Sequence, residues 1–217
     1  PLSLVFLSFS FSNRTLPHWT GPAYIGYILI AAAWLSGRQK QKKRLIPPVL
    51  KVSAGLILVL VVVGVAQIGY GVIPLTKMGM NDPTAQLYGY RQLSGKFQTA
   101  AGKAEINNEM PANAPIIESR WFPAANLDYY IGEPANRKVY AVGTLERIHK
   151  FYWINKQRGM PEKGSFAWYI GFSDDSPEPS PTIQSHFDSV TCRDTLILTR
   201  GGQVIRKAYL YRLYGWK

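Results

Sequence analysis

The first 73 residues contain neither aspartate nor glutamate: the 13 acidic residues of this 217-residue chain all lie at or beyond Asp82. The few charges in the acid-free stretch are basic, and five of them fall in the segment GRQKQKKR at 37–44. A stretch without carboxylates, whose basic residues lie between apolar runs, fits lipid better than water. The formal net charge of +12 therefore does not indicate nucleic-acid binding, because the rest of the chain has no stripe of Lys and Arg residues. We expect no nucleic-acid partner.

Cysteine is almost absent as well. Cys192 is the only one, which excludes an internal disulfide and leaves the redox compartment open. Together with His149 and His186 it lacks the spacing of a zinc site, so the sequence identifies no metal site and no cofactor. A glycine-rich phosphate loop and a nucleophile elbow are also missing, since the glycines of RGG belong to a hairpin pattern.

Two long apolar runs are present, at 16–36 (with YIGYILIAAAWL) and 52–72 (with GLILVLVVVGVAQIGYGV). Each has roughly the 20 residues that a helix needs to cross a hydrocarbon core of about 30 Å. A helix buried in a soluble domain can also be apolar all round. Two such runs around a basic loop favour a membrane, and we predict two full transmembrane helices plus the end of a third at 1–12.

The order of the segments predicts the orientation. Because the chain starts at Pro1 inside an apolar run, we expect the C-terminal part of a longer protein; a signal peptide would carry basic residues first. The basic loop 37–44 marks the cytoplasmic side. The segment NRTLPHWTGPAY at 13–24 and everything after 72 are then extracytoplasmic, which predicts a multi-pass protein of the cell (inner) membrane with an extracytoplasmic C-terminal domain.

Residues 74–217 follow the membrane part (1–73) and are enough for one domain with its own core. Strand and helix patterns alternate there and end in a hairpin, which predicts an α/β fold with a mixed sheet. A helix is expected to begin at Asn81 or Asp82, with Pro83 in its first turn, and to run through Phe97. The other expected elements are a strand at 114–121, a helix at 122–132, a strand at 137–143, a helix or irregular loop at 145–159, a strand at 165–172, a loop at 175–182 and a hairpin at 194–215.

The order of these motifs resembles a known family. LPHWTGPAY before a membrane helix, a basic turn, a last helix and DPTAQLYGYRQL opening an α/β domain are similar to the C-terminal half of type-C-fold glycosyltransferases. The likeness is to bacterial relatives of dolichyl-phosphate-mannose protein mannosyltransferases and of aminoarabinose lipid A transferases. It covers essentially the whole chain, and Tyr90 stands where that family usually has Trp.

The resemblance implies transfer of a sugar from a polyprenyl-phosphate carrier to a lipid, glycan or protein acceptor. It places the catalytic carboxylates in an early extracytoplasmic loop upstream of this chain, so no catalytic residue is named here. The alternative is a membrane-tethered extracytoplasmic binding or adaptor module without catalysis.

Two clusters are the candidate substrate contacts. Arg14, His18, Trp19 and Tyr24 lie at the expected membrane surface, where they contact a lipid phosphate or anchor a helix. Asp82, Tyr88 and Arg91 form the second cluster, either as a roof that grips sugar or acceptor, or as a capped helix in which Arg91 pairs with a carboxylate. A third set, His149, Tyr152 and Trp153, either lines a sugar-binding surface or packs between helix and sheet.

Overall fold

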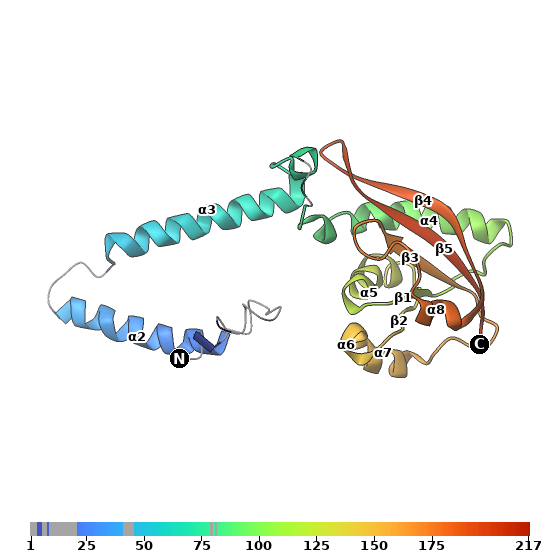
Figure 1. The fold of residues 1–217 in the computed structure, drawn as a ribbon, viewed down its shortest axis with the longest axis horizontal. Helices are drawn as coiled ribbons and strands as arrows, with labels where there is room; N and C mark the ends of the chain where they lie inside the picture. Colours follow the sequence, from blue (N-terminus) through green and yellow to red (C-terminus); the bar gives the residue numbers. More distant parts are fainter. Residues whose placement is uncertain (1–3, 6–7, 9–20, 41–45, 79, 81) are drawn as a thin grey trace. The chain divides into compact units, whose positions relative to one another are not determined.

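The computed structural model describes residues 4–5, 8, 21–40, 46–78, 80 and 82–217 (Figure 1). The chain divides into two compact units, residues 1–62 and 63–217. The division falls inside the helix α3 (Pro48–Tyr70), whose last turns belong with the second unit.

The first unit contains α2 (Gly21–Lys40) and most of α3. Pro48 opens α3, a position where its missing N–H costs nothing. Among the described residues, α3 alone is long and apolar enough to cross a membrane, and none of its apolar window is buried. The prediction of two full transmembrane helices is therefore not confirmed.

The predicted basic loop is partly helical. α2 continues through Gly37–Lys40, so the first four residues of the predicted basic loop are helical, because Arg, Gln and Lys propagate a helix readily. Residues 41–45 lie outside the described part. So does most of the expected helix end at 1–12, of which the structure describes Leu4, Val5 and Ser8.

The second unit contains a five-stranded mixed sheet in the order β2-β1-β3-β5-β4, which confirms the predicted α/β class. β1 lies parallel to β2 and β3, whereas β5 is antiparallel to β3 and β4. The strands are β1 (Ile116–Glu118), β2 (Val139–Ala141), β3 (Ala167–Phe172), β4 (Phe187–Arg200) and β5 (Gln203–Trp216).

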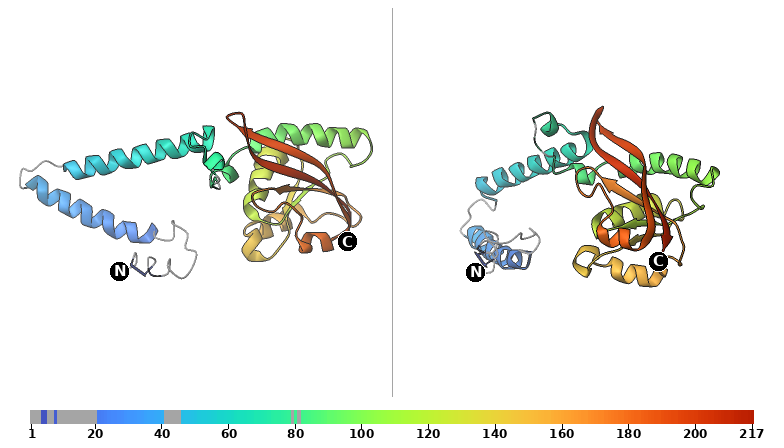
Figure 2. Two further views of the ribbon diagram at one scale, coloured as in Figure 1. Left: turned by 45° about the horizontal axis from the view of Figure 1, so that its top comes forward. Right: turned by 45° about the vertical axis from the view of Figure 1, so that its right-hand side comes forward.

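The predicted hairpin is confirmed. Gly201 and Gly202 connect β4 to β5 with φ angles of 56° and 76°, the left-handed values that a two-residue hairpin turn requires and that glycine adopts without strain. The hairpin is long, and α4 (Tyr90–Ile106) lies along β4 in the views of Figures 1 and 2.

Helices cover both faces of the sheet. One face packs against α4, α5 (Trp121–Leu127) and α7 (Phe151–Arg158), and its core includes Phe97, Trp168 and Ile170. The other face packs against α8 (Pro181–Ser185). The remaining helical segments are η2 (Leu75–Met78), η3 (Ala85–Leu87), η4 (Asp128–Gly132), a π-helical turn that continues α5, and α6 (Leu145–Ile148).

The predicted start of the first domain helix was wrong. Asp82 does cap a turn, by accepting hydrogen bonds from the backbone N–H and the hydroxyl of Thr84, but only the short η3 follows. The α-helix begins at Tyr90, because Gly89 has a φ of 93° and interrupts the helical path. The segment 145–159, expected as a helix or an irregular loop, forms α6 and α7 with a break at His149, whose φ is 47°.

Candidate functional site

A pocket lies at the start of α4. It has a volume of about 440 Å³ and is lined by Leu87–Gln92 together with Tyr130 of η4. The segment YGYR at 88–91 therefore contributes four consecutive lining residues. We call this cavity the YGYR pocket.

Gly89 shapes the pocket. Its φ of 93° is the left-handed conformation that glycine tolerates, and a Cβ added there would lie 3.3 Å from Cδ1 of Leu198 on the hairpin. The turn allows each neighbouring tyrosine ring to meet a different arginine of the hairpin. The guanidinium carbon of Arg200 lies 5.5 Å from the Tyr88 ring centre, and that of Arg206 lies 5.5 Å from the Tyr90 ring centre.

Tyr90 forms the inner wall of the pocket. Its ring stacks on Tyr130 with centroids 6.0 Å apart and meets Phe172 edge-on at 5.7 Å. Arg206 is buried beside it, donates to the carbonyl of Ala85 at 3.2 Å and pairs with Asp174 at 3.2 Å. Burial raises the pKa of Tyr90, so its hydroxyl stays protonated at neutral pH.

Asp82 is not among the residues that line the pocket. Its carboxylate is buried and pairs with the buried guanidinium of Arg200, which also donates to the carbonyl of Ile68 near the end of α3. Gln67 donates to the same carboxylate at 3.1 Å. Burial alone would raise the pKa of Asp82, but hydrogen bonds from Thr84 and Arg200 outweigh it and hold the pKa below its ordinary value. The structure thus separates Asp82 from Tyr88 and Arg91, which both line the pocket.

Arg91 is exposed at the pocket, and it makes no hydrogen bond or ion pair with the part of the chain that the structure describes. The carboxylate partner considered in the sequence analysis is therefore not seen. Gln92, next to it, is held by Thr199 of β4, whose backbone N–H donates to its Oε1 at 2.8 Å. The pocket thus combines a guanidinium, an amide and three phenols, with no carboxylate in its lining.

None of the other predicted site residues that the structure describes lines the YGYR pocket. Arg14, His18 and Trp19 lie outside the described residues. Tyr24 lies on α2 with an exposed side chain. No group of three His, Cys, Asp or Glu side chains suited to a metal ion occurs among the described residues, and Cys192 is an exposed free thiol.

Sequence reasoning missed a buried carboxyl group. Glu118 ends the apolar strand β1 and is almost fully buried, where its Oε1 accepts from the backbone N–H of Ser119 at 2.7 Å and from its hydroxyl at 3.2 Å. Burial raises the pKa of Glu118 to about 7. The signal was available, since an acidic residue directly after PII at the end of a parallel strand has no solvent-facing side.

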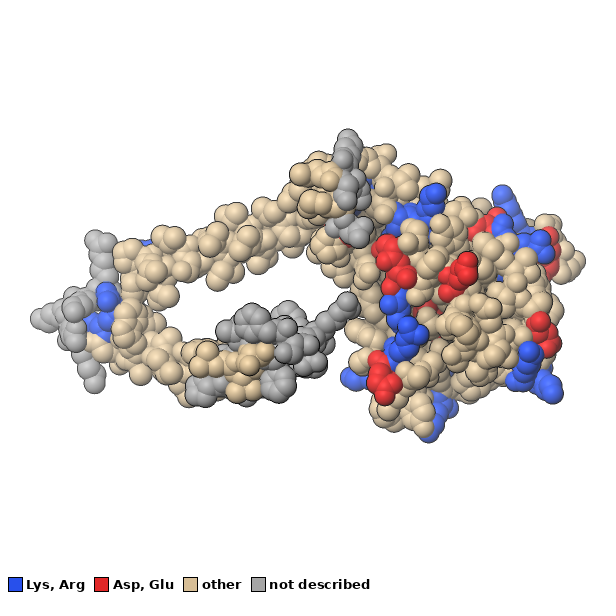
Figure 3. Space-filling view, in the orientation of Figure 1, with Lys and Arg blue, Asp and Glu red and all other residues tan. Residues whose placement is uncertain are grey.

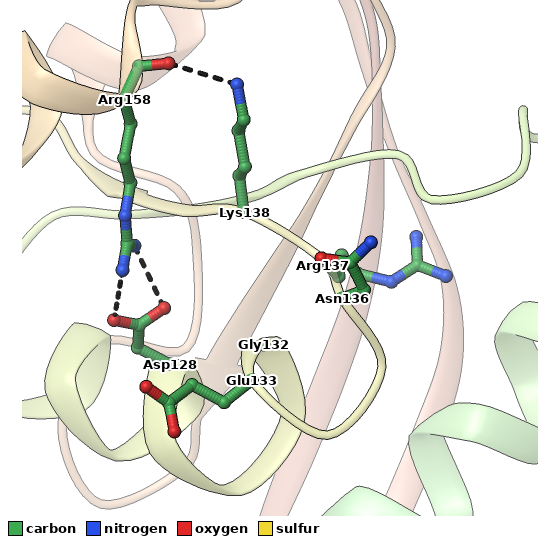
Figure 4. A pocket seen from close by; sticks show the side chains of 7 residues that line it. All are labelled: Asp128, Gly132, Glu133, Asn136, Arg137, Lys138 and Arg158. Carbon is green, nitrogen blue, oxygen red and sulfur yellow. Dashed lines mark hydrogen bonds and ion pairs between the residues drawn. The ribbon is translucent and has the colours of Figure 1, made fainter.

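A second pocket of about 440 Å³ lies around Gly132 at the end of η4 (Figure 4). Most of its charged groups already have protein partners. Arg158 holds both oxygens of Asp128 at 2.8 and 2.9 Å, and Lys138 donates to the carbonyl of Arg158 at 3.0 Å. These contacts describe a structural ion-pair network more than a ligand site.

The YGYR pocket therefore stands as the candidate binding site, since it leaves an exposed cation without a partner among the described residues beside aromatic walls. Guanidinium and phenol donors suit a phosphate or another oxyanion, and tyrosine faces suit a ring. No family model, curated protein sequence or solved structure matches this chain.

Proposed function

We propose that the chain is the C-terminal portion of an integral membrane glycosyltransferase that moves a sugar from a polyprenyl-phosphate carrier to a lipid, glycan or protein acceptor. In this proposal the protein is multi-pass, its C-terminal domain is extracytoplasmic, and the YGYR pocket binds the donor phosphate or its sugar.

The arrangement at the end of α3 supports the proposal most directly. The last turns of α3 and the YGYR pocket belong to one compact unit, and Arg200 joins them, because it donates to Ile68 of α3 and lies over the Tyr88 ring of the pocket. A ligand whose phosphate stays at the membrane surface needs fixed donors at the level where the membrane helix ends. Tyr88 and Tyr90 place phenol groups in the pocket, and the exposed guanidinium of Arg91 can donate to the same ligand.

The distribution of charge fits the same proposal. Figure 3 shows mostly uncharged residues along α3 and gathers the acidic and most basic side chains on the α/β domain, and the composition of α3 is apolar. The pocket itself offers a cation and no carboxylate, which suits binding of an anionic donor rather than proton transfer. In this proposal the chemistry depends on carboxylates outside this chain.

The runner-up is a membrane-tethered binding or adaptor module. The composition of the pocket favours it to the same degree, since phenols, an amide and a guanidinium bind ligands without performing acid–base chemistry. The two functions differ in one observable, which is sugar transfer by the natural protein that contains this chain.

The experiment uses that protein in lipid vesicles with a radiolabelled polyprenyl-phosphate sugar and a mixture of acceptors. Arg91→Ala should lower transfer about 10- to 100-fold, the loss expected for one charge-assisted contact of about 1.5–3 kcal/mol. Arg193→Ala is the matched control, because Arg193 is exposed on β4 and lines no described pocket.

The outcomes separate the functions. Transfer by the natural protein that falls with Arg91→Ala and not with Arg193→Ala supports the transferase and its donor pocket. Absence of transfer, together with donor binding that Arg91→Ala abolishes, favours the binding module. If Arg91→Ala and Arg193→Ala give the same transfer and the same donor binding, the pocket contributes to neither activity.

A further inference from the structure

The helices α5 and α7 both pack on β2, the edge strand of the sheet, and contact each other at two points. At one end, the ring of Trp121, which begins α5, lies 5.4 Å from the ring of His149, just before α7. At the other end, Asp128 follows α5 and pairs with Arg158, the last residue of α7, as the dashed lines of Figure 4 show. One contact joins the starts of the two helices and the other joins their ends, so the helices are neighbours along their length.

Each helix turns its apolar inner side toward the strands. On α5, Ala124 and Leu127 are fully buried. On α7, Phe151 is buried and Asn155 donates to the carbonyl of Ala141 in β2 at 2.7 Å. The opposite sides of both helices are left facing solvent.

Those outer sides carry large apolar and aromatic residues. Trp121 is 44% exposed and Trp153 is 56% exposed, although tryptophan is usually well covered. The exposed members of this surface, which we call the α5–α7 face, are Trp121 of α5, Tyr152 and Trp153 of α7, and two residues of the adjoining helical turns, Tyr129 of η4 and Leu145 of α6. Exposed apolar groups on consecutive helical segments mark an interaction surface rather than scattered surface residues.

The exposed charges of α6 and α7 are mainly positive. Arg147 and Lys150 are exposed next to α7, and Lys156 lies with its Nζ 4.3 Å from the centre of the Tyr152 ring. Glu146 is the exposed acidic residue in the same stretch. A mixture of tryptophan, tyrosine, leucine and lysine suits an anionic lipid surface, where rings enter the headgroup layer and amines meet phosphates.

We propose that the α5–α7 face is an interfacial surface that rests on anionic lipid headgroups. The apolar helix α3 precedes the domain in the same chain and supplies the tether. Tethering raises the effective concentration of the face at the headgroups, so a modest patch suffices. The α5–α7 face shares no residue with the lining of the YGYR pocket, although the ring centre of Tyr129 lies 4.9 Å from that of Tyr130 in the pocket, and lipid binding by the face does not require sugar transfer.

The test uses the full chain in vesicles and a nitroxide label on a single cysteine. In a Cys192→Ser background, one variant carries Trp153→Cys and the matched control carries Ser189→Cys, an exposed position on β4. Collision with oxygen, which dissolves in lipid, is compared with collision with a water-soluble nickel chelate. We expect a severalfold higher oxygen-to-nickel ratio at 153 than at 189 in vesicles that contain phosphatidylglycerol.

A charge test follows on the same labelled chain. Lys150→Glu with Lys156→Glu should lower the ratio at 153 toward the value at 189, whereas the control Lys103→Glu, on α4, should not. Phosphatidylcholine vesicles without the anionic lipid should act like the charge reversal. Unchanged spectra from a label at 189 in each variant show that the fold is intact.

Two results overturn the proposal. One is equal nickel access at 153 and 189 in anionic vesicles. The other is a label at 153 that stays in water but is immobilised when an oligosaccharide is added, which assigns the face to carbohydrate instead.

Discussion

The helices α3 and α4 differ in where their apolar side chains lie: most of those of α4 are buried in the domain, whereas most of those of α3 are exposed on the protein surface. α4 is amphipathic, with a buried stripe that includes Leu93 and Phe97 and an exposed polar side. α3 is apolar on every side, and almost all of its side chains face outward, with Gln67 as its buried residue. An apolar run indicates that its side chains are kept from water. A helical period within the run indicates that one side of the helix packs against the protein.

Asp82, in the segment between the two helices, forms a polar cluster with Gln67 of α3 and Arg200 of β4. These polar residues do not belong to the apolar pattern of either helix. Through Arg200, which donates to Ile68, they connect the end of α3 to the hairpin of the domain. The stability of the second unit can therefore come from this cluster or from the buried stripe of α4, and substitutions in each separate the two contributions.

The largest effect should come from Arg200→Met. Removing the guanidinium leaves the carboxylate of Asp82 buried without its partner, which costs about 3–5 kcal/mol in a pair of this kind. The free energy of unfolding of the domain, measured with denaturant in detergent, gives the loss. Arg158→Met is the control, since its pair with Asp128 is partly exposed and should cost about 1 kcal/mol or less. Equal losses would show that burial of the Asp82 pair has no special weight.

The second prediction compares leucines on the two helices. Leu93→Ala empties a fully buried position of α4 and should cost about 2–5 kcal/mol of domain stability. Leu60→Ala changes a residue of α3 that is 62% exposed and should leave the unfolding midpoint of the domain unchanged. A comparable loss from Leu60→Ala would contradict the interpretation of α3 as a helix that the domain does not cover.

The third prediction concerns Glu118 and pH. Its folded-state pKa of about 7 lies above the ordinary value of 4.5, so between these values the folded state keeps a proton that the unfolded state has lost. Stability should therefore fall as pH rises from about 4.5 to about 7 and level off above, by about 3 kcal/mol for this group.

Glu118→Gln stays neutral and should remove that fall, as seen in denaturation midpoints across the pH range. Glu162→Gln, at an exposed position, should keep the wild-type profile. A Glu118→Gln profile that still falls over this interval would show that another group is responsible.

The smallest effect should come from a glycine pair at the start of α4. Gly89→Ala forces an L side chain to a φ of 93° beside Leu198 and should cost about 1–2 kcal/mol. Gly95→Ala lies in open space within the same helix and should stabilise it by about 0.5–1 kcal/mol. Thermal unfolding of the two variants should move in opposite directions. A shift of the same sign would show that Gly89 is not required by its backbone angle.

Much of the fold could be predicted because its signals are local. The β-strands around Ile116 and Ile170 follow from short apolar runs, and the turn at Gly201 follows from its two glycines. The apolar length of α3 is equally local. The start of α4 was misjudged for the same reason, since Asp82 and Pro83 form a good local cap whatever their distant partner does.

The candidate site could be predicted only in part. The segment with Tyr88 and Arg91 stood out in the sequence, and the structure brings both residues to one pocket. Their separation from Asp82 could not be foreseen, because the partner of Asp82 is Arg200, 118 positions later in the chain.

By itself, the sequence determined which segments form strands and turns, the acid-free composition of the first 73 residues and the apolar length of α3, because these depend on neighbours along the chain. The tertiary structure alone decided that Asp82 pairs with Arg200, that Arg91 stays without a partner among the described residues, and that Glu118 is buried. A charge finds its partner and its degree of hydration only when strands and helices distant in sequence pack together, and no local pattern encodes that meeting.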